Sequence, residues 1–207
     1  MHIPDGFLDP KTWIGCSVVT TGLLSIAVKR SRDKLAEKQV PLIGVMAAFI
    51  FAAQMINFPV IGGTSGHLIG GVLAAVLFGP FTASIIMTVI LLIQCFLFND
   101  GGVTALGANI LNMGIIAPFL GYAVYNSLRG FGSVAASFIA AWFSVLAASA
   151  ACAVELTVSG TSPLPVVLPA MLFWHFFIGI GEGVITAAVV GYLARVKSHL
   201  LTEIVKV

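Results

Sequence analysis

Long apolar runs alternate along the chain with short stretches that hold the charged and the turn-forming residues. A helix needs about 20 apolar residues to cross the hydrocarbon core of a bilayer. No Asp, Glu, Lys or Arg occurs between Lys38 and Asp100, an interval of 61 residues that is too long for one or two crossings. Turn residues at Asn57–Pro59, Gly62–Gly66 and Gly79–Pro80 divide this interval into three pieces.

The complete pattern predicts an all-α integral membrane protein with seven transmembrane helices, formed by a single domain over residues 1–207. We expect the spans at residues 12–28, 41–56, 67–78, 81–98, 103–128, 131–154 and 164–194. The third of these has only 12 residues, which is also short enough for a re-entrant segment. Its length alone therefore does not decide the number of crossings.

The positions of the basic residues favour seven crossings over six. Cytoplasmic loops carry an excess of Lys and Arg, so the basic segment 29–38 is expected inside the cell. With seven crossings, nine of the ten basic residues are cytoplasmic and only Lys11 is external. We therefore expect the N-terminus outside and the C-terminus in the cytoplasm, with residues 1–11 as an external segment. The external loops would then carry four acidic residues, which suits a cation: Asp5, Asp9, Asp100 and Glu155.

The composition excludes most other classes of protein. Apolar residues make up 59% of the chain and charged residues 9%, against about 45–50% and about 25% in soluble domains. The mean hydropathy of +1.08 agrees with this. A soluble enzyme, a nucleic-acid binder and a disordered regulator are therefore excluded. We expect a multi-pass protein in membrane lipid, without a cleavable signal peptide because its start lacks a basic region. No phosphate-binding loop motif is present, so uphill transport would take its energy from partner subunits or an ion gradient.

The first two residues, Met1 and His2, form a candidate metal chelate. A free terminal amine and the His2 backbone nitrogen close a five-membered ring on a metal, and that nitrogen and His2 Nδ1 close a six-membered ring. Three nitrogens then lie in one plane, an arrangement that selects Ni(II) or Cu(II) among divalent ions. Binding requires loss of the amide proton and should strengthen as the pH rises. The ordinary alternative is a frayed terminus, which the turn-forming sequence Pro4-Asp5-Gly6 makes less favourable.

His67 is the candidate for the fourth nitrogen ligand. It follows a Gly-rich loop on the expected external side and begins the short third span, where Thr64 or Ser65 could cap the helix. The alternative is a helix-start histidine that bonds only to the backbone. His175 and Glu182 are seven residues apart, hence on one face of the last span, and are either functional or a lock between helices.

Small residues recur at every fourth position in several spans, which lets helix backbones approach closely in lipid. The rows are Gly44/Ala48/Ala52, Gly66/Gly70, Ala136/Ala140/Ser144/Ala148 and Gly179/Gly183. Most of these rows are expected to pack within the chain. We expect at least one to face another subunit, and prefer the first row, with packing inside the chain as the alternative.

Four sequence features together resemble the CbiM/NikM family of substrate-specificity (S) components of energy-coupling-factor (ECF) transporters. They are Met1–Leu8 (MHIPDGFL), the loop histidine His67, Asn99–Asn109 (NDGGVTALGAN) and Gly181–Gly183 (GEG). The resemblance covers essentially the whole chain. It implies a seven-helix protein of a prokaryotic cell membrane that binds Ni(II) or Co(II) from outside, through Met1, His2 and His67.

The resemblance also implies partners: a transmembrane coupling (T) subunit, two cytoplasmic ATPase subunits and a small accessory membrane subunit. It implies neither an organic cofactor nor an enzymatic reaction. We expect four polar side chains to orient the ligand imidazoles: Asn99, Asp100, Asn109 and Asn112.

Three other functions compete with metal capture at this stage. An S component for an organic micronutrient would need an aromatic-lined pocket and no free amine. An intramembrane metalloprotease is disfavoured because the chain lacks the HExxH motif. A square of four nitrogens also leaves no in-plane position for water, whereas catalytic zinc keeps an open one. A purely structural subunit would bind no metal.

Overall fold

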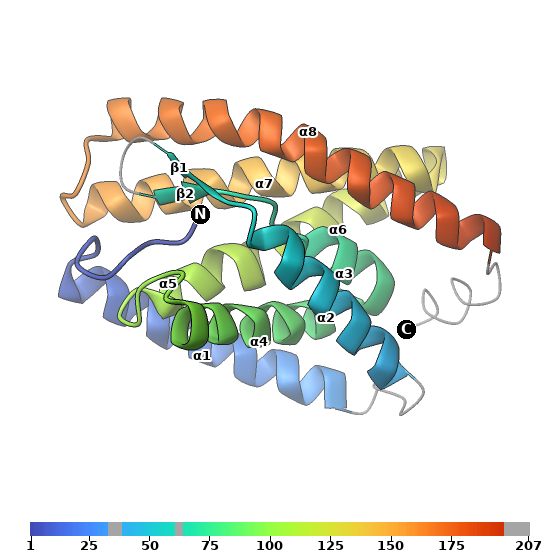
Figure 1. Cartoon of the computed structure of the whole chain (residues 1–207), viewed down its shortest axis with the longest axis horizontal. Coiled ribbons are helices and arrows are strands. Elements are labelled where there is room, and N and C mark those ends of the chain that lie inside the picture. The colour runs from blue at the N-terminus through green and yellow to red at the C-terminus, as the bar shows by residue number, and fades with distance from the viewer. Residues whose placement is uncertain (33–38, 61–63, 197–207) are drawn as a thin grey trace.

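The computed structural model describes residues 1–32, 39–60 and 64–196. The long helices lie side by side and run back and forth along the long axis of the molecule (Figure 1). The helices are α1 (Pro10–Arg32), α2 (Val40–Gln54), α3 (Gly71–Phe78), α4 (Pro80–Phe98), α5 (Leu106–Ile110), α6 (Ala117–Leu128), α7 (Ser133–Val158) and α8 (Leu164–Val196). A π-helix over Leu111–Ile116 joins α5 to α6, and a 3₁₀ turn over Arg129–Phe131 follows α6.

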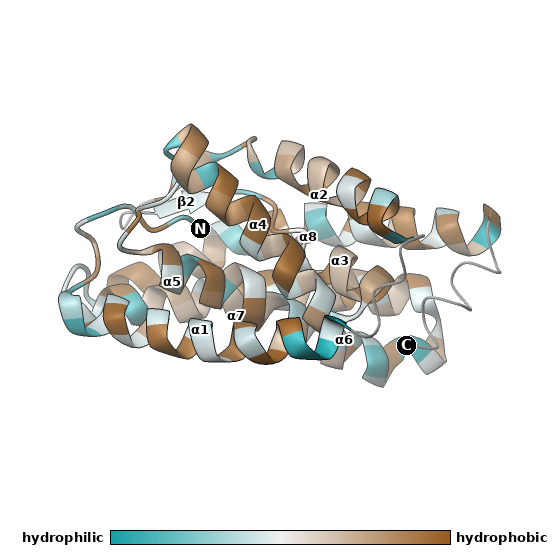
Figure 2. Cartoon of the chain, turned by 90° about the horizontal axis from the view of Figure 1, so that it is seen from below, coloured by the Kyte–Doolittle hydropathy of each residue, from teal (hydrophilic) through white to brown (hydrophobic). Residues whose placement is uncertain are grey.

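Five helical segments of the described chain are long and apolar enough to cross a membrane: α1, α4, the continuous helix from α5 to the 3₁₀ turn, α7 and α8. Apolar residues run along the lengths of the helices, and the most hydrophilic residues lie mainly near their ends (Figure 2). The 15-residue α2 is about 22 Å long and the eight-residue α3 about 12 Å, both shorter than the roughly 30 Å hydrocarbon core. Neither short helix alone spans the bilayer, so the count of seven crossings stays a prediction.

The third expected span differs from its prediction. The helix begins at Gly71 and not at His67, and Thr64 and Ser65 lie in a strand instead of capping it. Residues 67–70 belong to neither a helix nor a strand, and Gly70 turns the chain into α3 with a φ of +78°. A Cβ atom at Gly70 would lie 2.8 Å from Ile50, so only glycine fits this turn.

A two-stranded antiparallel hairpin interrupts the otherwise helical fold, which the expected all-α class did not include. It pairs β1 (Phe58–Val60) with β2 (Thr64–Gly66), with Pro59 opposite Ser65. The expected Gly62–Gly63 turn between the strands lies outside the described residues. Gly66 is required here because a Cβ atom would lie 2.9 Å from the ring of Phe58.

Most small-residue rows pack inside the chain, as expected. Gly179 and Gly183 of α8 lie against Trp142 and Phe138 of α7, with the nearest atoms about 3 Å from an added Cβ. The row from Ala136 to Ala148 is buried as well. The row Gly44/Ala48/Ala52 is different, because all three residues are exposed on α2. Packing within the described chain therefore does not explain that row.

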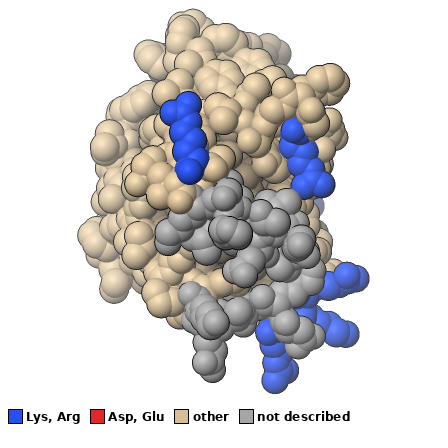
Figure 3. Space-filling view, turned by 90° about the vertical axis from the view of Figure 1, so that its right-hand side faces the viewer, with Lys and Arg blue, Asp and Glu red and all other residues tan. Residues whose placement is uncertain are grey.

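Basic residues gather at one end of the molecule. Figure 3 shows this end, where Lys and Arg side chains lie at several places on the visible face and no Asp or Glu appears. The described residues concerned lie in the last turns of α1 and α8 and directly after α6: Lys29, Arg30, Arg32, Arg195 and Arg129. This is the end that we expect on the cytoplasmic side. The hairpin and α5 lie toward the opposite end (Figure 1).

Candidate metal centre

The first residues of the chain are folded into the protein, at the end opposite the basic residues. Met1, His2 and Ile3 are buried. The chain then turns at Asp5 and Gly6, where Gly6 has a φ of +83°, and enters α1 at Pro10. The tail is therefore docked, as the turn-forming sequence predicted, and not frayed.

Polar contacts to the tail backbone fix its register. Asn109 accepts a hydrogen bond from Ile3 N at 2.8 Å and donates one to Ile3 O at 3.1 Å. Gly102 N also donates to Ile3 O, at 2.9 Å. The Asp5 carboxylate accepts hydrogen bonds from the backbone N–H groups of Val103 and Thr104. The Thr104 hydroxyl also donates to Asp5, and these bonds lower the pKa of that carboxyl group.

Glycines in the loop after α4 let the tail approach this closely. A Cβ atom at Gly102 would lie 2.3 Å from Asp5 N. A Cβ atom at Gly101 would lie 3.2 Å from the ring of His2, and the φ of +95° there also favours glycine. The motif Asn99-Asp100-Gly101-Gly102 thus forms the wall against which the N-terminal tail packs.

The structure brings the rings of His2 and His67 together. They are stacked, with centroids 4.6 Å apart and an interplanar angle of 22°. In His67, Nδ1 lies 2.7 Å from the carbonyl of Leu68, so it carries the proton and leaves a lone pair on Nε2. His67 Nε2 is buried and has no hydrogen-bond partner. In His2, Nε2 lies 3.1 Å from Gln94 Oε1, which assigns the proton there and leaves a lone pair on Nδ1.

His2 Nδ1 lies 3.2 Å from Asp100 Oδ1, but the two atoms do not form a hydrogen bond. With the proton on Nε2, a nitrogen lone pair faces a carboxylate oxygen, and within the described residues no hydrogen bond to Nδ1 relieves their repulsion. A cation at this point would. In each histidine, one ring nitrogen thus donates its proton to an acceptor and the other is unprotonated. This arrangement is typical of metal-binding histidines.

Two backbone nitrogens lie beside these imidazoles. The Met1 amine and His2 N both donate to the hydroxyl of Ser65, at 3.1 and 3.2 Å, so they converge on one point. Thr64 donates to the carbonyl of His2 and fixes the same residue from β2. The Met1 amine, the His2 backbone nitrogen and the two stacked imidazoles therefore lie in one buried region, and their joint binding of a metal stays a prediction.

Burial keeps these donors free of protons. It lowers the pKa of the Met1 amine to about 5. It is also the largest cause that lowers the pKa of His2 to about 3 and the pKa of His67 well below its usual value. The charge of the amine lowers both further. At neutral pH the amine and both imidazoles are therefore uncharged, which leaves their lone pairs available to a metal.

The four expected orienting residues have different roles. Asp100 alone lies beside the His2 imidazole, and burial raises the pKa of the Asp100 carboxyl group. Asn109 holds the tail backbone instead, and Asn112 bonds to Glu155 at 2.6 Å. Asn99 ends α4 with a φ of +53°. The residue that orients His2 is Gln94, which the sequence analysis missed although it is a polar residue within an apolar span.

The prediction that four acidic residues lie in external loops is wrong for one of them. Glu155 lies inside α7, which continues four residues beyond the expected end of that span, and it is only 8% exposed. Its carboxylate bonds to Asn112 and accepts a hydrogen bond from the thiol of Cys16 at 3.6 Å. Glu155 therefore links α1, α7 and the π-helix, and the acidic vestibule is reduced to Asp5, Asp9 and Asp100.

A cleft of about 450 Å³ leads to the tail. It is lined by residues of the tail, the hairpin and the loop after α4, among them His2, Asn57, Ser65 and Asp100. Asn57 donates to Asp100 Oδ2 at 3.0 Å, which leaves the other carboxylate oxygen toward His2. The cleft gives a small ion a path to the buried nitrogens.

Side chains alone do not form this centre. Within the described ranges, no group of three or more His, Cys, Asp or Glu residues could hold a metal ion. His175 is buried in α8, and its Nδ1 lies 2.7 Å from the Met171 carbonyl one turn earlier. Glu182 bonds to the backbone after His67. The candidate donor set therefore combines two imidazoles with the terminal amine and one backbone nitrogen.

The chain is similar to proteins named for metal transport. A family model described as the cobalt uptake substrate-specific transmembrane region matches residues 2–200. A protein of Archaeoglobus fulgidus, named as a fused nickel transport protein NikMN, is 42% identical over 98% of this chain and 68% of its own length. A protein of Haloquadratum walsbyi, named as a cobalt transport protein CbiM, is 32% identical over 99% of this chain and 98% of its own length.

A solved structure has the same fold. The crystal structure of a transition metal transporter is 38% identical, covers 98% of this chain and 96% of that chain, and superimposes with a TM-score of 0.91. The relatives come from archaea and bacteria. The expected assignment to a multi-pass membrane protein of a prokaryote is therefore confirmed.

Proposed function

We propose that the chain, which belongs to the CbiM family of cobalt-uptake substrate-specific transmembrane regions, captures Ni(II) through the Met1 amine, the His2 amide and Nδ1, and His67 Nε2. Family membership makes it a membrane component of cobalt or nickel transport, and not an enzyme. The observation that carries the proposal is the stacked His2–His67 pair, whose unprotonated nitrogens lie beside two convergent backbone nitrogens.

The donor set favours nickel. Four nitrogens in a plane are the preferred environment of Ni(II) and Cu(II), whereas Co(II) does not require it. The His2 amide must lose its proton to bind, which a strongly polarising ion promotes. Co(II) remains the alternative substrate, since imidazole and amine ligands also suit it. In either case the metal is the cargo and not a resident cofactor.

Capture is the first step of uptake in this proposal. The metal enters through the cleft beside Asp100 from outside the cell, and the basic end faces the cytoplasm. Energy is supplied by an ECF-type assembly: a transmembrane coupling subunit, two cytoplasmic ATPase subunits and a small accessory membrane subunit. The chain itself acts as the substrate-specificity component.

A test of the terminal chelate uses the N-terminus itself. Any residue placed before Met1 turns the amine into a peptide nitrogen, so the two fused rings cannot form. We expect an uncleaved N-terminal tag to abolish nickel binding in calorimetry, and His2→Ala to do the same. The absorption band of planar Ni(II) should disappear with the tag and return after cleavage that regenerates Met1.

A C-terminal tag is the matched control and should leave nickel binding intact. A tagged protein that kept both its affinity and its absorption band would reject the terminal chelate. Nickel binding would then have to use His67 with other donors.

A further inference from the structure

We propose that Glu182 is a positioning residue for His67, which fixes the segment after it and offsets the positive end of α3 against the bound cation. This inference rests on the proposed function, because it assumes that His67 binds the metal. Glu182 lies on α8, far along the chain from the metal-binding residues. The sequence alone does not decide whether Glu182 is functional or a lock between helices.

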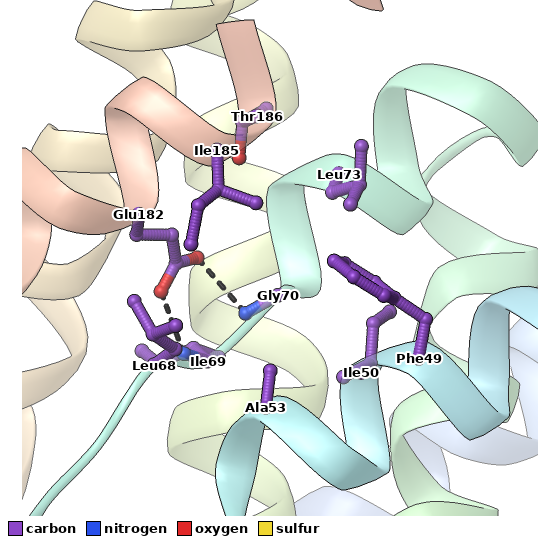
Figure 4. A pocket seen from close by; sticks show the side chains of 10 residues that line it. All are labelled: Phe49, Ile50, Ala53, Leu68, Ile69, Gly70, Leu73, Glu182, Ile185 and Thr186. Atoms are coloured by element: carbon purple, nitrogen blue, oxygen red, sulfur yellow. Dashed lines mark hydrogen bonds between the residues drawn. The ribbon is translucent and has the colours of Figure 1, made fainter. Parts of the chain in front are cut away.

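The Glu182 carboxylate accepts hydrogen bonds from two successive backbone N–H groups. Ile69 N donates to Oε2 at 2.6 Å and Gly70 N donates to Oε1 at 2.9 Å (Figure 4). Both oxygens thus act as acceptors, which suits the ionised carboxylate. Glu182 is only 2% exposed, so bulk water does not compete for these bonds.

The segment that Glu182 binds, residues 67–70, includes His67 and is not helical. Non-helical backbone inside a membrane protein must find partners for its N–H and C=O groups. Glu182 of α8 supplies two acceptors, and Gln54 of α2 donates to the carbonyl of Ile69 at 2.6 Å. The His67 ring itself bonds to the carbonyl of Leu68. The orientation of His67 is therefore fixed through a short segment held from both sides.

Among the described side chains that hydrogen-bond to residues 68–70, only Glu182 can carry a negative charge. The N-terminal end of a helix carries a partial positive charge of about half a unit, which disfavours a cation nearby. α3 begins at Gly71, directly after the two residues that Glu182 binds, and His67 lies four residues before it. The carboxylate places a negative charge at that helix end, and thereby offsets its repulsion of a metal on His67.

No basic side chain of the described ranges forms an ion pair with Glu182. A buried carboxylate within a membrane protein is costly unless a positive charge compensates it. Here the compensation comes from backbone N–H groups and the helix end, and from the metal when it is bound. Glu182 is therefore expected to stabilise the metal-bound state more than the empty one.

The substitution Glu182→Gln tests the charge with little change of shape. A small cavity of about 20 Å³, with space for about one water molecule, already lies beside the carboxylate between α2, α3 and α8. An alanine would enlarge it and confuse the result. Glutamine keeps the volume and one acceptor, but it presents an amide group to the second N–H. We expect nickel affinity in calorimetry to fall about tenfold or more, because bonds to charged groups are the stronger ones.

Two controls separate positioning from general damage. Glu155→Gln removes the other buried carboxylate, which binds Asn112 and does not touch the metal-binding segment, so nickel affinity should stay within about threefold. Glu182→Asp keeps the charge and should bind nickel better than Glu182→Gln. The absorption band of bound Ni(II) should shift in Glu182→Gln and not in Glu155→Gln, since only the former changes the setting of His67.

Each outcome has one meaning. Unchanged affinity and band in Glu182→Gln would overturn the inference, and so would equal losses in the two glutamine variants. If Glu182→Gln does not fold, Glu182→Asp decides, because unaltered nickel binding with this shorter side chain would reject positioning. The unmodified chain is measured first: absence of nickel binding there would reject the proposed function itself.

Discussion

Asn109 should control nickel affinity although it does not touch the metal. Its buried side chain makes both of its hydrogen bonds to the backbone of Ile3, the residue after the chelate. In Asn109→Ala, Ile3 O keeps the bond from Gly102 N, but Ile3 N is left buried without a partner. The tail would then no longer be held in register with His67.

The magnitude follows from these contacts. A buried donor without a partner costs about 1–3 kcal/mol, and the second lost hydrogen bond adds about 0.5–1.5 kcal/mol. The docked tail should therefore lose about 2–4 kcal/mol, which corresponds to nickel affinity about 30-fold to 1,000-fold weaker. The loss falls on the tail and not on the helix packing, so the thermal midpoint of the metal-free protein should change little.

Calorimetric titration of the detergent-purified protein with Ni(II) measures this loss. Asn126→Ala is the matched control, because Asn126 is exposed on α6 and makes no side-chain hydrogen bond within the described structure. A folded Asn109→Ala protein with affinity within threefold of the original would refute the reasoning. The register of the tail would then be set by other contacts.

Three further predictions follow from the site and the arrangement in the membrane. His67→Ala should abolish tight nickel binding while the protein still inserts, because no helix depends on this side chain; undiminished affinity in calorimetry would remove His67 from the site. In a cysteine-free background, an impermeant thiol reagent on intact cells should label a cysteine at Gly63 and not one at Asp33; the reverse would overturn the topology. Ala48→Leu should weaken the purified transporter complex and its nickel uptake, since the exposed small-residue row is our candidate surface for the coupling subunit; an intact complex with a normal uptake rate would exclude it.

The candidate donor residues could be predicted from the sequence, but most of the residues that hold them in place could not. The terminal amine of Met1 and the imidazoles of His2 and His67 are the donors that the sequence predicts; the structure stacks the two rings and places the amine beside Ser65, and metal binding by them stays a prediction. Gln94 and Ser65 also contact the donors, but their partners are far away in the chain, and one sequence does not reveal such contacts. Gln94 did carry a signal, because a polar residue inside an apolar span needs a partner.

The fold was predictable where length and hydropathy suffice, and not where backbone geometry decides. The long helices appear near their expected positions, for example α8 at Leu164–Val196. Hydropathy cannot distinguish an extended apolar segment from a helical one, so the start of α3 at Gly71 and the hairpin before it were missed. Glu155 was placed in a loop because charge was taken as the end of a span, whereas Asn112 satisfies it inside the helix.

The π-helix at Leu111–Ile116 constrains the number of residues in that stretch of the chain. It ends two residues before Pro118, which lacks the N–H that a regular helix would direct to Gly114, so the wider turn fits there. Each residue of an α-helix turns it by about 100°. A chain one residue shorter here would form a regular helix and rotate Asn109 away from Ile3, while α6 kept its packing. Relatives that hold their first residues in the same way should therefore show no gap in this stretch, whatever side chains they carry there.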